Sequence, residues 1–529
     1  MSDTEPSKAS LIGEMYLSPG PSPLQLLGIP IRAEKNLPPS QREDWIAHRD
    51  FTPIEALPDD GLEAPIGDDT PWAPDSPGWQ ILLMYLYTDL MSREAAGNPV
   101  RVTLVGAGKF GSMFLAQVPT SVGLVVTCIA DLSPERARAI CHDVGWSADQ
   151  VAQVEFTDDA ESAIKRDDVD VVVEATGQPA AGIRHARAAF HHGKHIVMVN
   201  VEADALAGSL LAREALSAGI VYTMAYGDQP ALICEQVEWA RSCGFKVIAA
   251  GKGTKYLPAY HTSTPATVWD HYGLTANEAY SAGMNSKMFN SFLDGTKSAL
   301  EMAVVANACD LCPAQDGLQF PPCSADDLAQ VLRPQEEGGV LEFPGQVEVV
   351  SSLARDGTII ERDLRWGVYV VLEAPNAYAA ACFRQYGMNT DESGRYSAMY
   401  KPFHLIGLEL NISILSAALL GKPTGMTRGF KGDAVAIAKR ALAAGDVLDG
   451  EGGATVWGKL LPAERSLAIG CLPIGLANSV VLRNDIAAGQ PVTWQDVDFR
   501  PDDPAVVARK SMEQLFAVSN PSDGPVPEQ

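Results

Sequence analysis

The sequence predicts an α/β fold in which a doubly wound parallel sheet is followed by an α+β domain and a small β module. Between residues 100 and 217, short apolar runs alternate with helical segments, as parallel strands joined by crossover helices require. The chain of 529 residues also exceeds what one hydrophobic core usually supports, so several domains are expected. Short apolar runs separated by glycines near the C-terminus indicate the β module.

The segments that precede the sheet differ from it in composition. Residues 1–76 are rich in Pro, Asp and Glu, and they are expected to form a loosely ordered or surface-wrapping arm. From Trp79 the spacing of apolar residues predicts a helix that ends before Gly97-Asn98-Pro99. The expected strands are 102–105, 125–130, 151–156, 169–174 and 195–199, and the expected helices after them are 158–166, 179–192 and 205–217.

A glycine-rich turn follows the first strand, in the sequence Gly106-Ala-Gly108-Lys109-Phe110-Gly111. The first glycine permits the turn, the second lets a pyrophosphate approach the backbone, and the third lets helix and strand pack closely. Asp131, twenty residues after Gly111, ends the second apolar run, where a carboxylate accepts hydrogen bonds from a ribose. The pattern predicts a Rossmann-type domain over 77–245 that binds NAD or NADP and transfers hydride. The alternative is a glycine-rich turn without a ligand.

Two later strands end in polar residues that extend the cofactor hypothesis. Thr176 and Gly177 follow one strand, and Asn200 and Glu202 follow the next. Because ligands of open α/β sheets lie beyond the carboxyl ends of the strands, we expect these four residues near the nicotinamide and its ribose. Ordinary strand-to-helix turn chemistry is the alternative.

Charge and composition narrow the class of protein. Forty basic against 66 acidic residues give a net charge of −26, which repels nucleic acids and anionic membranes. An anionic substrate would therefore need a local group of cations. The N-terminus lacks a signal-peptide pattern and no apolar run is long enough to span a membrane, so a cytoplasmic protein is expected. Nine scattered cysteines suit free, mostly buried thiols in a reducing compartment.

A second informative stretch, from Ala249 to Glu301, concentrates lysines and amides in this acidic chain. Lysine supplies a compact cation for a phosphate or a developing alkoxide, while Asn and Asp orient hydroxyls or a metal ion. Residues 250–262 are expected to form a loop that closes on an anion. If 284–304 is one helix, its polar residues share a face; a solvated face of ion pairs is the alternative. The candidate catalytic residues are Lys252, Lys255, His261, Asn285, Lys287, Asn290, Asp294 and Lys297.

These motifs carry a resemblance to a known family. Gly251-Lys-Gly-Thr-Lys-Tyr-Leu-Pro-Ala-Tyr-His261 and Gly283-Met-Asn-Ser-Lys-Met-Phe-Asn-Ser-Phe-Leu-Asp-Gly295 are similar to homoserine-dehydrogenase-like oxidoreductases. Within that family the chain most resembles the DXR-like (DRL) class of 1-deoxy-D-xylulose 5-phosphate reductoisomerase, over roughly 80–480. The resemblance implies a catalytic and dimerisation domain over 246–435 and reduction of a small phosphorylated ketose or aldehyde by NADPH. It also implies a divalent metal, Mg or Mn, and a homo-oligomer that is a dimer or a dimer of dimers.

The end of the second strand departs from that pattern. A carboxylate at Asp131 repels a 2′-phosphate, which favours NAD over NADP, although Arg136 or Arg138 would offset the repulsion. The cofactor is therefore predicted as NAD or NADP, with NAD ahead.

The C-terminal third contains further strands and the β module. Strands are expected at 347–352 and 367–374, followed by a helix through Leu420 that His404 enters. His404 is either a buried, hydrogen-bonded residue or a proton relay that reaches the substrate. Residues 436–500 resemble a SAF domain, which would bind a sugar or cap a dimer, and 501–529 are expected to be a tail.

These observations predict an NAD(P)H-dependent oxidoreductase that acts on a small molecule, with a DXR-like reductoisomerase as the nearest resemblance. A dehydrogenase of a sugar acid, polyol or homoserine-like alcohol, without carbon rearrangement, is the alternative within enzymes. A cofactor-bound sugar sensor or scaffold is the alternative of another class. Replacing Lys287 by Met is expected to remove turnover while leaving cofactor binding intact.

Overall fold

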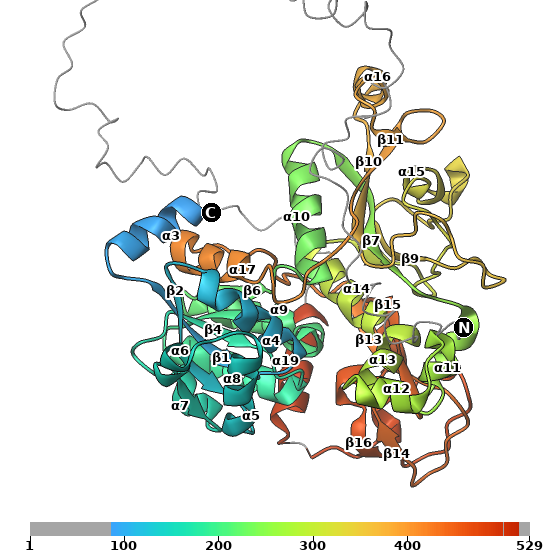
Figure 1. The fold of residues 1–529 in the computed structure, drawn as a ribbon. Helices are drawn as coiled ribbons and strands as arrows, with labels where there is room; N and C mark the ends of the chain where they lie inside the picture. Colours follow the sequence, from blue (N-terminus) through green and yellow to red (C-terminus); the bar gives the residue numbers. More distant parts are fainter. Residues whose placement is uncertain (1–85, 501, 518–529) are drawn as a thin grey trace, which may run out of the picture. The chain divides into compact units, whose positions relative to one another are not determined.

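The computed structural model describes residues 86–500 and 502–517, which Figure 1 colours along the chain. The predicted arm over 1–76, the start of the helix predicted from Trp79, and residues 518–529 of the predicted tail lie outside the described residues. The described chain begins with α3 (Leu86–Ala95), which ends before Gly97-Asn98-Pro99 as expected.

The first sheet has six parallel strands in the order β3-β2-β1-β4-β5-β6. This is the order of a doubly wound dinucleotide-binding sheet, so the predicted fold class is confirmed. The strands are β1 (Val100–Val105), β2 (Leu124–Ala130), β3 (Glu155–Thr157), β4 (Val171–Glu174), β5 (His195–Met198) and β6 (Tyr222–Met224). The helices between them are α4 (Lys109–Gln117), α5 (Pro134–Asp143), α6 (Ala148–Ala152), α7 (Ala160–Ile164), α8 (Pro179–His191) and α9 (Val201–Ser217).

The strand predicted at 151–156 is wrong in its first half. Ser147 and Gln150 form a capping box that starts α6, and β3 begins at Glu155. Val151 and Val154 are both buried, the first in the helix and the second in the turn after it. The apolar alternation therefore reflects a short capped helix and its turn, since a cap fixes a helix start where side-chain periodicity alone does not.

The second sheet is mixed and follows the order β11-β12-β10-β7-β9-β8. Its central strand β7 pairs antiparallel with β10 and parallel with β9. The helices α10 (Gln229–Ser242) and α14 (Thr296–Cys309) pack against this sheet (Figure 1). The strands are β7 (Lys246–Thr254), β8 (Cys312–Pro313), β9 (Gln346–Ser351), β10 (Val368–Glu373), β11 (Asn389–Thr390) and β12 (Tyr396–Lys401), and α15 (Leu328–Val331) and α16 (Ala377–Gln385) also belong to this region.

The loop predicted over 250–262 is wrong in its first part, because β7 continues through Thr254. A Cβ atom at Gly251 would stand 1.8 Å from the backbone oxygen of Glu348, and one at Gly253 would stand 2.0 Å from that of Leu364. These glycines allow a close approach of neighbouring backbone instead of a turn. Lys252, between them, therefore sits in a central strand and does not belong to a closing loop.

The single helix predicted over 284–304 is also wrong. The chain forms α13 (Ser286–Leu293), then turns at Gly295 with φ of +94°, and then forms α14. That left-handed backbone requires glycine and reorients the second helix, so the polar residues on either side of it do not share one face. Two shorter helices, α11 (Val268–Tyr272) and α12 (Ala276–Ser281), precede α13.

After β12 the chain returns to the first sheet. α17 (Asn411–Leu415) and a π-helical turn (Ser416–Leu420) place Ile414 and Leu415 in the same buried core as strand β1. His404 lies in the segment before α17, so its predicted place inside the helix is wrong. Gly407, with a φ of +72°, departs from helical geometry between His404 and the start of α17.

The C-terminal module consists of two antiparallel strand pairs. β13 (Gly432–Ala438) pairs with β15 (Val456–Pro462), and β14 (Val447–Asp449) pairs with β16 (Asn478–Val481). A short helix, α18 (Ala463–Ile469), follows β15.

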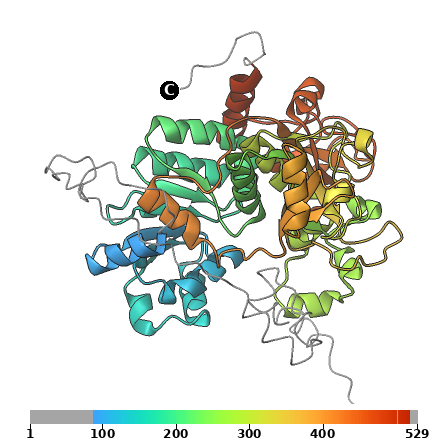
Figure 2. The same ribbon diagram turned by 90° about the horizontal axis from the view of Figure 1, so that it is seen from above.

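Part of the predicted tail is instead a helix. α19 (Pro504–Ala517) packs against α8 and α9, beside the green helices in Figure 2. Arg509 anchors it through a buried ion pair with Asp433, at 2.6 Å between Nη2 and Oδ2. The sequence pattern missed this helix because its anchor is a buried charge pair rather than an apolar stripe alone.

No described helix is both long enough and apolar enough to cross a membrane. All nine cysteines lie within the described residues, and each is a free thiol. The residue bounds predicted for the domains stay predictions.

Candidate active site

The glycine-rich turn has the geometry of a phosphate-binding loop. Gly106 has φ of +97°, and a Cβ there would stand 2.7 Å from the backbone oxygen of Ala175. A Cβ at Gly111 would stand 2.5 Å from the backbone oxygen of Gly106. At Gly108 no described atom lies within 4 Å of the corresponding position. The loop therefore leaves open space at its middle glycine, beside the N-terminus of α4, where a pyrophosphate fits.

Asp131, directly after β2, has a carboxylate that is fixed by several hydrogen bonds. It accepts hydrogen bonds from the backbone N–H groups of Ala107 (2.9 Å) and Ser133 (3.0 Å) and from Nη2 of Arg136 (2.9 Å). Burial raises the pKa of this carboxyl, but these hydrogen bonds outweigh burial and lower it overall. The Arg136 side chain is 56% exposed, so it can rotate toward a ribose phosphate or away from a ribose hydroxyl. Arg138 instead stacks on Phe156, at 4.3 Å.

The polar residues after β4 and β5 lie side by side because these strands are neighbours in the sheet. Nδ2 of Asn200 lies 3.4 Å from Oγ1 of Thr176 and donates to the backbone oxygen of Gln178 at 2.9 Å. Asn200 also caps α9 by accepting from Ala203 N–H. Gly177 has φ of +67° and open space around it. The carboxyl ends of both strands thus lie at one edge of the sheet, and the polar residues there are hydrogen-bonded to each other.

Lys297 reaches this edge from α14. Its Nζ lies 2.8 Å from Oε1 of Glu202, and both side chains are largely buried, at 18% and 13% exposure. Burial lowers the pKa of Lys297, but the nearby carboxylates, with Glu202 the strongest, raise it overall. The ammonium therefore stays protonated throughout the physiological pH range.

One turn further along α14, Glu301 holds a second lysine. Lys252 is buried, and its Nζ donates to Glu301 and to Oε1 of Gln229, the latter at 2.8 Å. Asp228, just before Gln229, has a raised pKa because it is buried and because Glu301 is close. We call this group of polar residues the strand-tip cluster; its members are Glu202, Asp228, Gln229, Lys252, Lys297 and Glu301.

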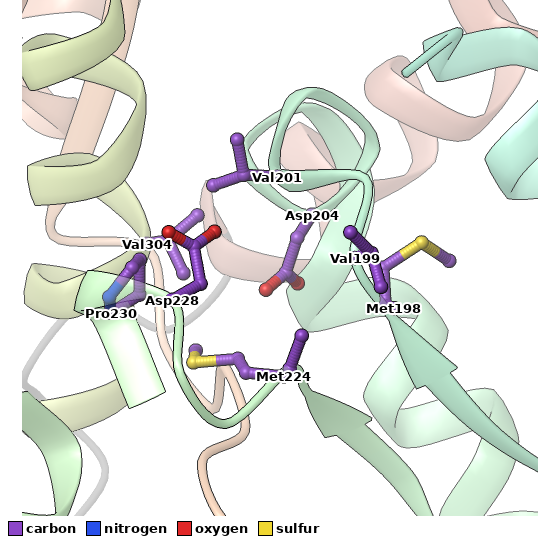
Figure 3. A pocket seen from close by; sticks show the side chains of 9 residues that line it. Met198, Val199, Val201, Asp204, Met224, Asp228, Pro230 and Val304 are labelled. Atoms are coloured by element: carbon purple, nitrogen blue, oxygen red, sulfur yellow. The ribbon is translucent and has the colours of Figure 1, made fainter. Parts of the chain in front are cut away.

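A small hollow borders this cluster at the carboxyl ends of β5 and β6. Figure 3 shows Asp204 and Asp228 on opposite sides of it, with Val304 of α14 beside Asp228. Burial raises the pKa of Asp204 to about 6, while hydrogen bonds from Tyr222 and Thr427 oppose the rise. The carboxyl ends of the strands of a doubly wound sheet are where a ligand is expected.

Sequence reasoning missed Asp204, Asp228, Gln229 and Glu301. One signal was present: Gly227-Asp228-Gln229-Pro230 follows strand β6 with the same polar ending that singled out the two earlier strands. Glu301 gave no such signal, since it lies in an apolar helix and acquires its role from Lys252, which is distant in sequence.

Three other predicted residues form a separate group against the C-terminal module. Asp294 pairs with Lys439 at 2.7 Å, with side-chain exposures of 0% and 2%. Lys439 also donates to the backbone oxygens of Ser263 (2.6 Å) and Gly453 (2.7 Å). Asn290 donates to the backbone oxygen of Gly452, and Lys287 donates to that of Asp449. We call these contacts the module interface; its members are Lys287, Asn290, Asp294, Lys439 and the loop 449–455.

His261 belongs to the same interface. Its Nδ1 donates to the backbone oxygen of Asp294 (2.7 Å), so Nε2 accepts from the Tyr256 hydroxyl (2.9 Å). The ring stacks on Trp457 of the module, with centroids 3.8 Å apart. Burial lowers the pKa of His261 to about 4, so the ring is neutral at physiological pH.

The remaining predicted residues lie apart from both groups. Lys255 donates to the backbone oxygen of His271 at 2.6 Å, and burial lowers its pKa. Asn285 caps α13 by accepting from the N–H groups of Lys287 and Met288. His404 is half-buried and contacts the backbone oxygen of Trp366 through Nδ1 at 2.7 Å. Within residues 86–500 and 502–517, no three His, Cys, Asp or Glu side chains are grouped so as to hold a metal ion.

Two segments match models of known protein families. Residues 100–199, which contain β1 to β5, match the NAD-binding Rossmann fold of the Gfo/Idh/MocA oxidoreductase family. Residues 227–410, which contain the second sheet, match the catalytic domain of the oxidoreductase DRL. The chain carries two oxidoreductase domains. The predicted oxidoreductase class, its NAD(P) cofactor and the resemblance of the catalytic domain to DRL are therefore confirmed, while the homoserine-dehydrogenase-like and SAF-like assignments stay predictions.

Two solved structures match parts of the chain. Myo-inositol dehydrogenase from Lactobacillus casei is 17% identical over 32% of this chain and 50% of its own length, with a TM-score of 0.24. Biliverdin reductase from Synechocystis sp. PCC 6803 is 19% identical over 30% and 48%, with a TM-score of 0.23. The chain thus spans about half the length of these structures. Among curated proteins, none matches the sequence significantly.

Proposed function

We propose that this protein is an NAD(P)H-dependent reductase of a small carbonyl compound, and that Lys297 acts as its general acid. The observation that carries the proposal is the Lys297–Glu202 ion pair at the tip of β5. In a doubly wound sheet this edge faces the reactive end of a bound dinucleotide. A protonated lysine there would polarise a carbonyl oxygen and donate a proton to it.

The other residues of the edge have supporting roles in this proposal. Gly106, Gly108 and Gly111 shape the pyrophosphate cradle, with Lys109 and Phe110 at the helix start, and Asp131 with Arg136 faces the adenosine ribose. A nicotinamide bound beyond them would supply the hydride. Thr176, Gly177 and Asn200 border its place, and Glu202 orients the Lys297 ammonium. Lys252, held by Glu301 and Gln229, fixes β7 against α14.

The remaining predicted residues are proposed to support the fold. Lys287, Asn290, Asp294 and His261 hold α13 and the C-terminal module together, and Lys255 and Asn285 fix local backbone. His404 lies close enough to lower the pKa of Asp228, so it remains a candidate proton donor at the rim of the site.

Two substrate classes are compatible with the strand-tip cluster. The match of the catalytic domain to DRL favours a phosphorylated ketose and a DXR-like reductoisomerisation. The charge balance favours a neutral polyol or hydroxy-carbonyl compound, because Glu202, Asp228 and Glu301 outnumber Lys252 and Lys297. No described carboxylates form a metal-binding group, and the proposed chemistry rests on Lys297 without a metal.

The test is consumption of NADH and NADPH by the purified protein across phosphoketoses, sugar acids, polyols and aldehydes. We expect turnover in at least one class and its loss in Lys297→Met. Cofactor binding without turnover in any class would favour the sensor alternative. Light scattering of the same sample would test the proposed homo-oligomer, and cell fractionation would test the cytoplasmic location.

A further inference from the structure

The end of β4 carries a buried carboxylate beside the glycine-rich turn. Glu174 is the last residue of β4, and its side chain is fully buried. The next two residues adjoin the turn, because a Cβ at Gly106 would stand 2.7 Å from the backbone oxygen of Ala175 and 3.1 Å from the backbone nitrogen of Thr176. Glu174 is therefore a buried neighbour of residues that border the proposed dinucleotide site.

The Glu174 carboxylate fixes the hydroxyl of Thr176. Oε1 of Glu174 accepts a hydrogen bond from Oγ1 of Thr176 at 2.5 Å, a short distance that is typical of a hydroxyl on an ionised carboxylate. The same oxygen lies 3.1 Å from Nδ1 of His185, a buried residue of α8. Because a carboxylate only accepts, both neighbours donate to it, and the one hydrogen of the Thr176 hydroxyl is committed to Glu174.

Thr176 consequently presents acceptor lone pairs at this edge of the sheet. Its Oγ1 lies 3.4 Å from the backbone N–H of Gln178 and 3.4 Å from Nδ2 of Asn200, which are long contacts. The Asn200 amide is engaged by shorter bonds, because Nδ2 donates to Gln178 O at 2.9 Å and Oδ1 accepts from the Ala203 N–H at 3.0 Å. The half-buried Thr176 oxygen can therefore still accept a strong hydrogen bond, and its partner must be a donor.

The second oxygen of Glu174 shows that this carboxylate is costly to bury. Within the described residues, Oε2 of Glu174 is buried and has no hydrogen-bond partner. Such an oxygen lowers stability, whereas an apolar side chain at the same place would not. The rest of β4, Val171–Val173, is apolar and equally buried. A carboxylate that ends this apolar strand at a cost in stability is typical of a functional position.

We propose that Glu174 is a positioning residue for the dinucleotide, which holds the Thr176 hydroxyl so that its oxygen accepts a hydrogen bond from the nicotinamide riboside. That part of the cofactor offers two kinds of donor, the carboxamide N–H groups and the ribose hydroxyls. Glu174 acts through Thr176 and does not itself contact the cofactor. The inference rests on the reductase function proposed above.

Two substitutions of Glu174 test whether the acceptor oxygen is what matters. Glu174→Met removes the acceptor and frees the Thr176 hydroxyl to rotate, whereas Glu174→Gln keeps an amide oxygen that accepts from it. In calorimetric titrations with the preferred dinucleotide, NADH or NADPH, we expect E174M to bind at least fivefold more weakly than wild type and E174Q to stay within twofold. The matching fragment, ADP or its 2′-phosphate, lacks the nicotinamide riboside, and its affinity should change less than twofold in both variants.

A control and a second pair of variants keep the test decisive if E174M does not fold. The control Glu214→Met removes the partner of Arg187 on α9 and should change neither affinity. Thr176→Val removes the hydroxyl and keeps the shape of the side chain, whereas Thr176→Ser keeps the hydroxyl. We expect T176V to bind the dinucleotide at least fivefold more weakly, with the fragment unchanged, and T176S to bind both like wild type.

The ligand ADP-ribose, or its 2′-phosphate, identifies the donor because it carries the second ribose without the nicotinamide. If T176V weakens ADP-ribose as much as the dinucleotide, the donor is a ribose hydroxyl; if it weakens the dinucleotide alone, the donor is the carboxamide. Either result supports the proposal.

Two results would overturn the proposal. One is a dinucleotide affinity in E174M or T176V equal to that of wild type. The other is an equal loss for the dinucleotide and for the ADP fragment, since that pattern indicates a general disturbance of the fold. Failure of wild type to bind either dinucleotide would contradict the reductase function itself, and this inference with it.

Discussion

The strand-tip cluster and the module interface use the same residue types in different ways. Each contains a lysine paired with a carboxylate, at 2.8 Å for Lys297–Glu202 and 2.7 Å for Lys439–Asp294. The Lys439 side chain is only 2% exposed, and its ammonium also donates hydrogen bonds to two backbone oxygens. Lys297 keeps 18% exposure and faces further carboxylates. The difference separates a pair that holds the fold from a pair that remains accessible to a ligand.

The same comparison explains why the sequence placed these residues together. Lys287, Asn290, Asp294 and Lys297 are spaced as one helical face, and Gly295 divides them. The first three turn to the module, and Lys297 turns to the first sheet. The predictions below test whether the two groups are as separate as this geometry indicates.

The largest expected effect is on stability, at the sealed pair. Lys439→Met leaves the buried Asp294 carboxylate without its cation, which should lower the free energy of unfolding by about 3–5 kcal/mol. Denaturant unfolding followed by circular dichroism measures this. Lys431→Met, which breaks an exposed pair with Asp310, is the control and should cost less than about 1 kcal/mol. Equal losses in both variants would contradict the structural role of the sealed pair.

His261 should give the module interface a pH dependence. Its folded-state pKa of about 4 lies below its unfolded value, so the unfolded chain binds more protons between pH 6.5 and 4. Stability should fall as pH falls through that window, by on the order of 3 kcal/mol from this residue. His261→Gln should flatten the profile measured by denaturant unfolding, whereas the exposed His192→Gln should not. A wild-type profile in H261Q would show that the ring titrates normally.

The strand-tip pair should govern turnover. Lys297→Met removes the proposed acid and should lower kcat about 100-fold or more, with dinucleotide affinity within about threefold of wild type. The control is Lys246→Met, which changes an exposed lysine at the first residue of β7. Steady-state kinetics and fluorescence titration provide both numbers. Full activity in K297M would remove Lys297 from the mechanism.

Arg136 should determine the affinity of the site for NADPH relative to NADH. In Arg136→Ala the affinity for NADPH should fall about tenfold more than that for NADH, since one charge-assisted contact to the 2′-phosphate is lost. Arg138→Ala, which changes the residue stacked on Phe156, should affect neither cofactor. Parallel losses for NADH and NADPH in R136A would place Arg136 outside the ribose site.

The smallest expected effect separates the two groups most sharply. Lys287 was expected from sequence to be essential, but its Nζ contacts the backbone of Asp449 in the module. Lys287→Met should therefore change kcat less than about threefold, because one partly buried hydrogen bond contributes roughly 1 kcal/mol to stability. The substrate assay used for K297M measures it. A loss as large as that of K297M would restore the single polar face that the sequence suggested.

The cofactor half of the molecule was predictable because its signals are local. Gly106 and Gly111 occupy positions where backbone geometry or close packing requires glycine, Gly108 leaves open space for a ligand, and Asp131 follows its strand as expected. The parallel arrangement of the first sheet follows from the alternation of strands and helices.

The catalytic half was less predictable because its contacts join distant segments. Lys252 of β7 contacts Gln229 of α10 and Glu301 of α14, and no spacing in the sequence links these three residues. Gly251 and Gly253 were interpreted as loop residues, although the close approach of Glu348 and Leu364 is what requires them. Side-chain periodicity cannot show which backbone will pass over a strand.

The central claim is that a nicotinamide dinucleotide lies across Gly108 at the carboxyl edge of the first sheet. Fluorescence titration of NADH and NADPH against wild type and Gly108→Ala tests it most directly, because a methyl group there meets no described atom and should leave the melting temperature unchanged. We predict that wild type binds one dinucleotide per chain and that G108A binds it at least tenfold more weakly. Equal affinity in both proteins, or no binding to wild type, would contradict the account.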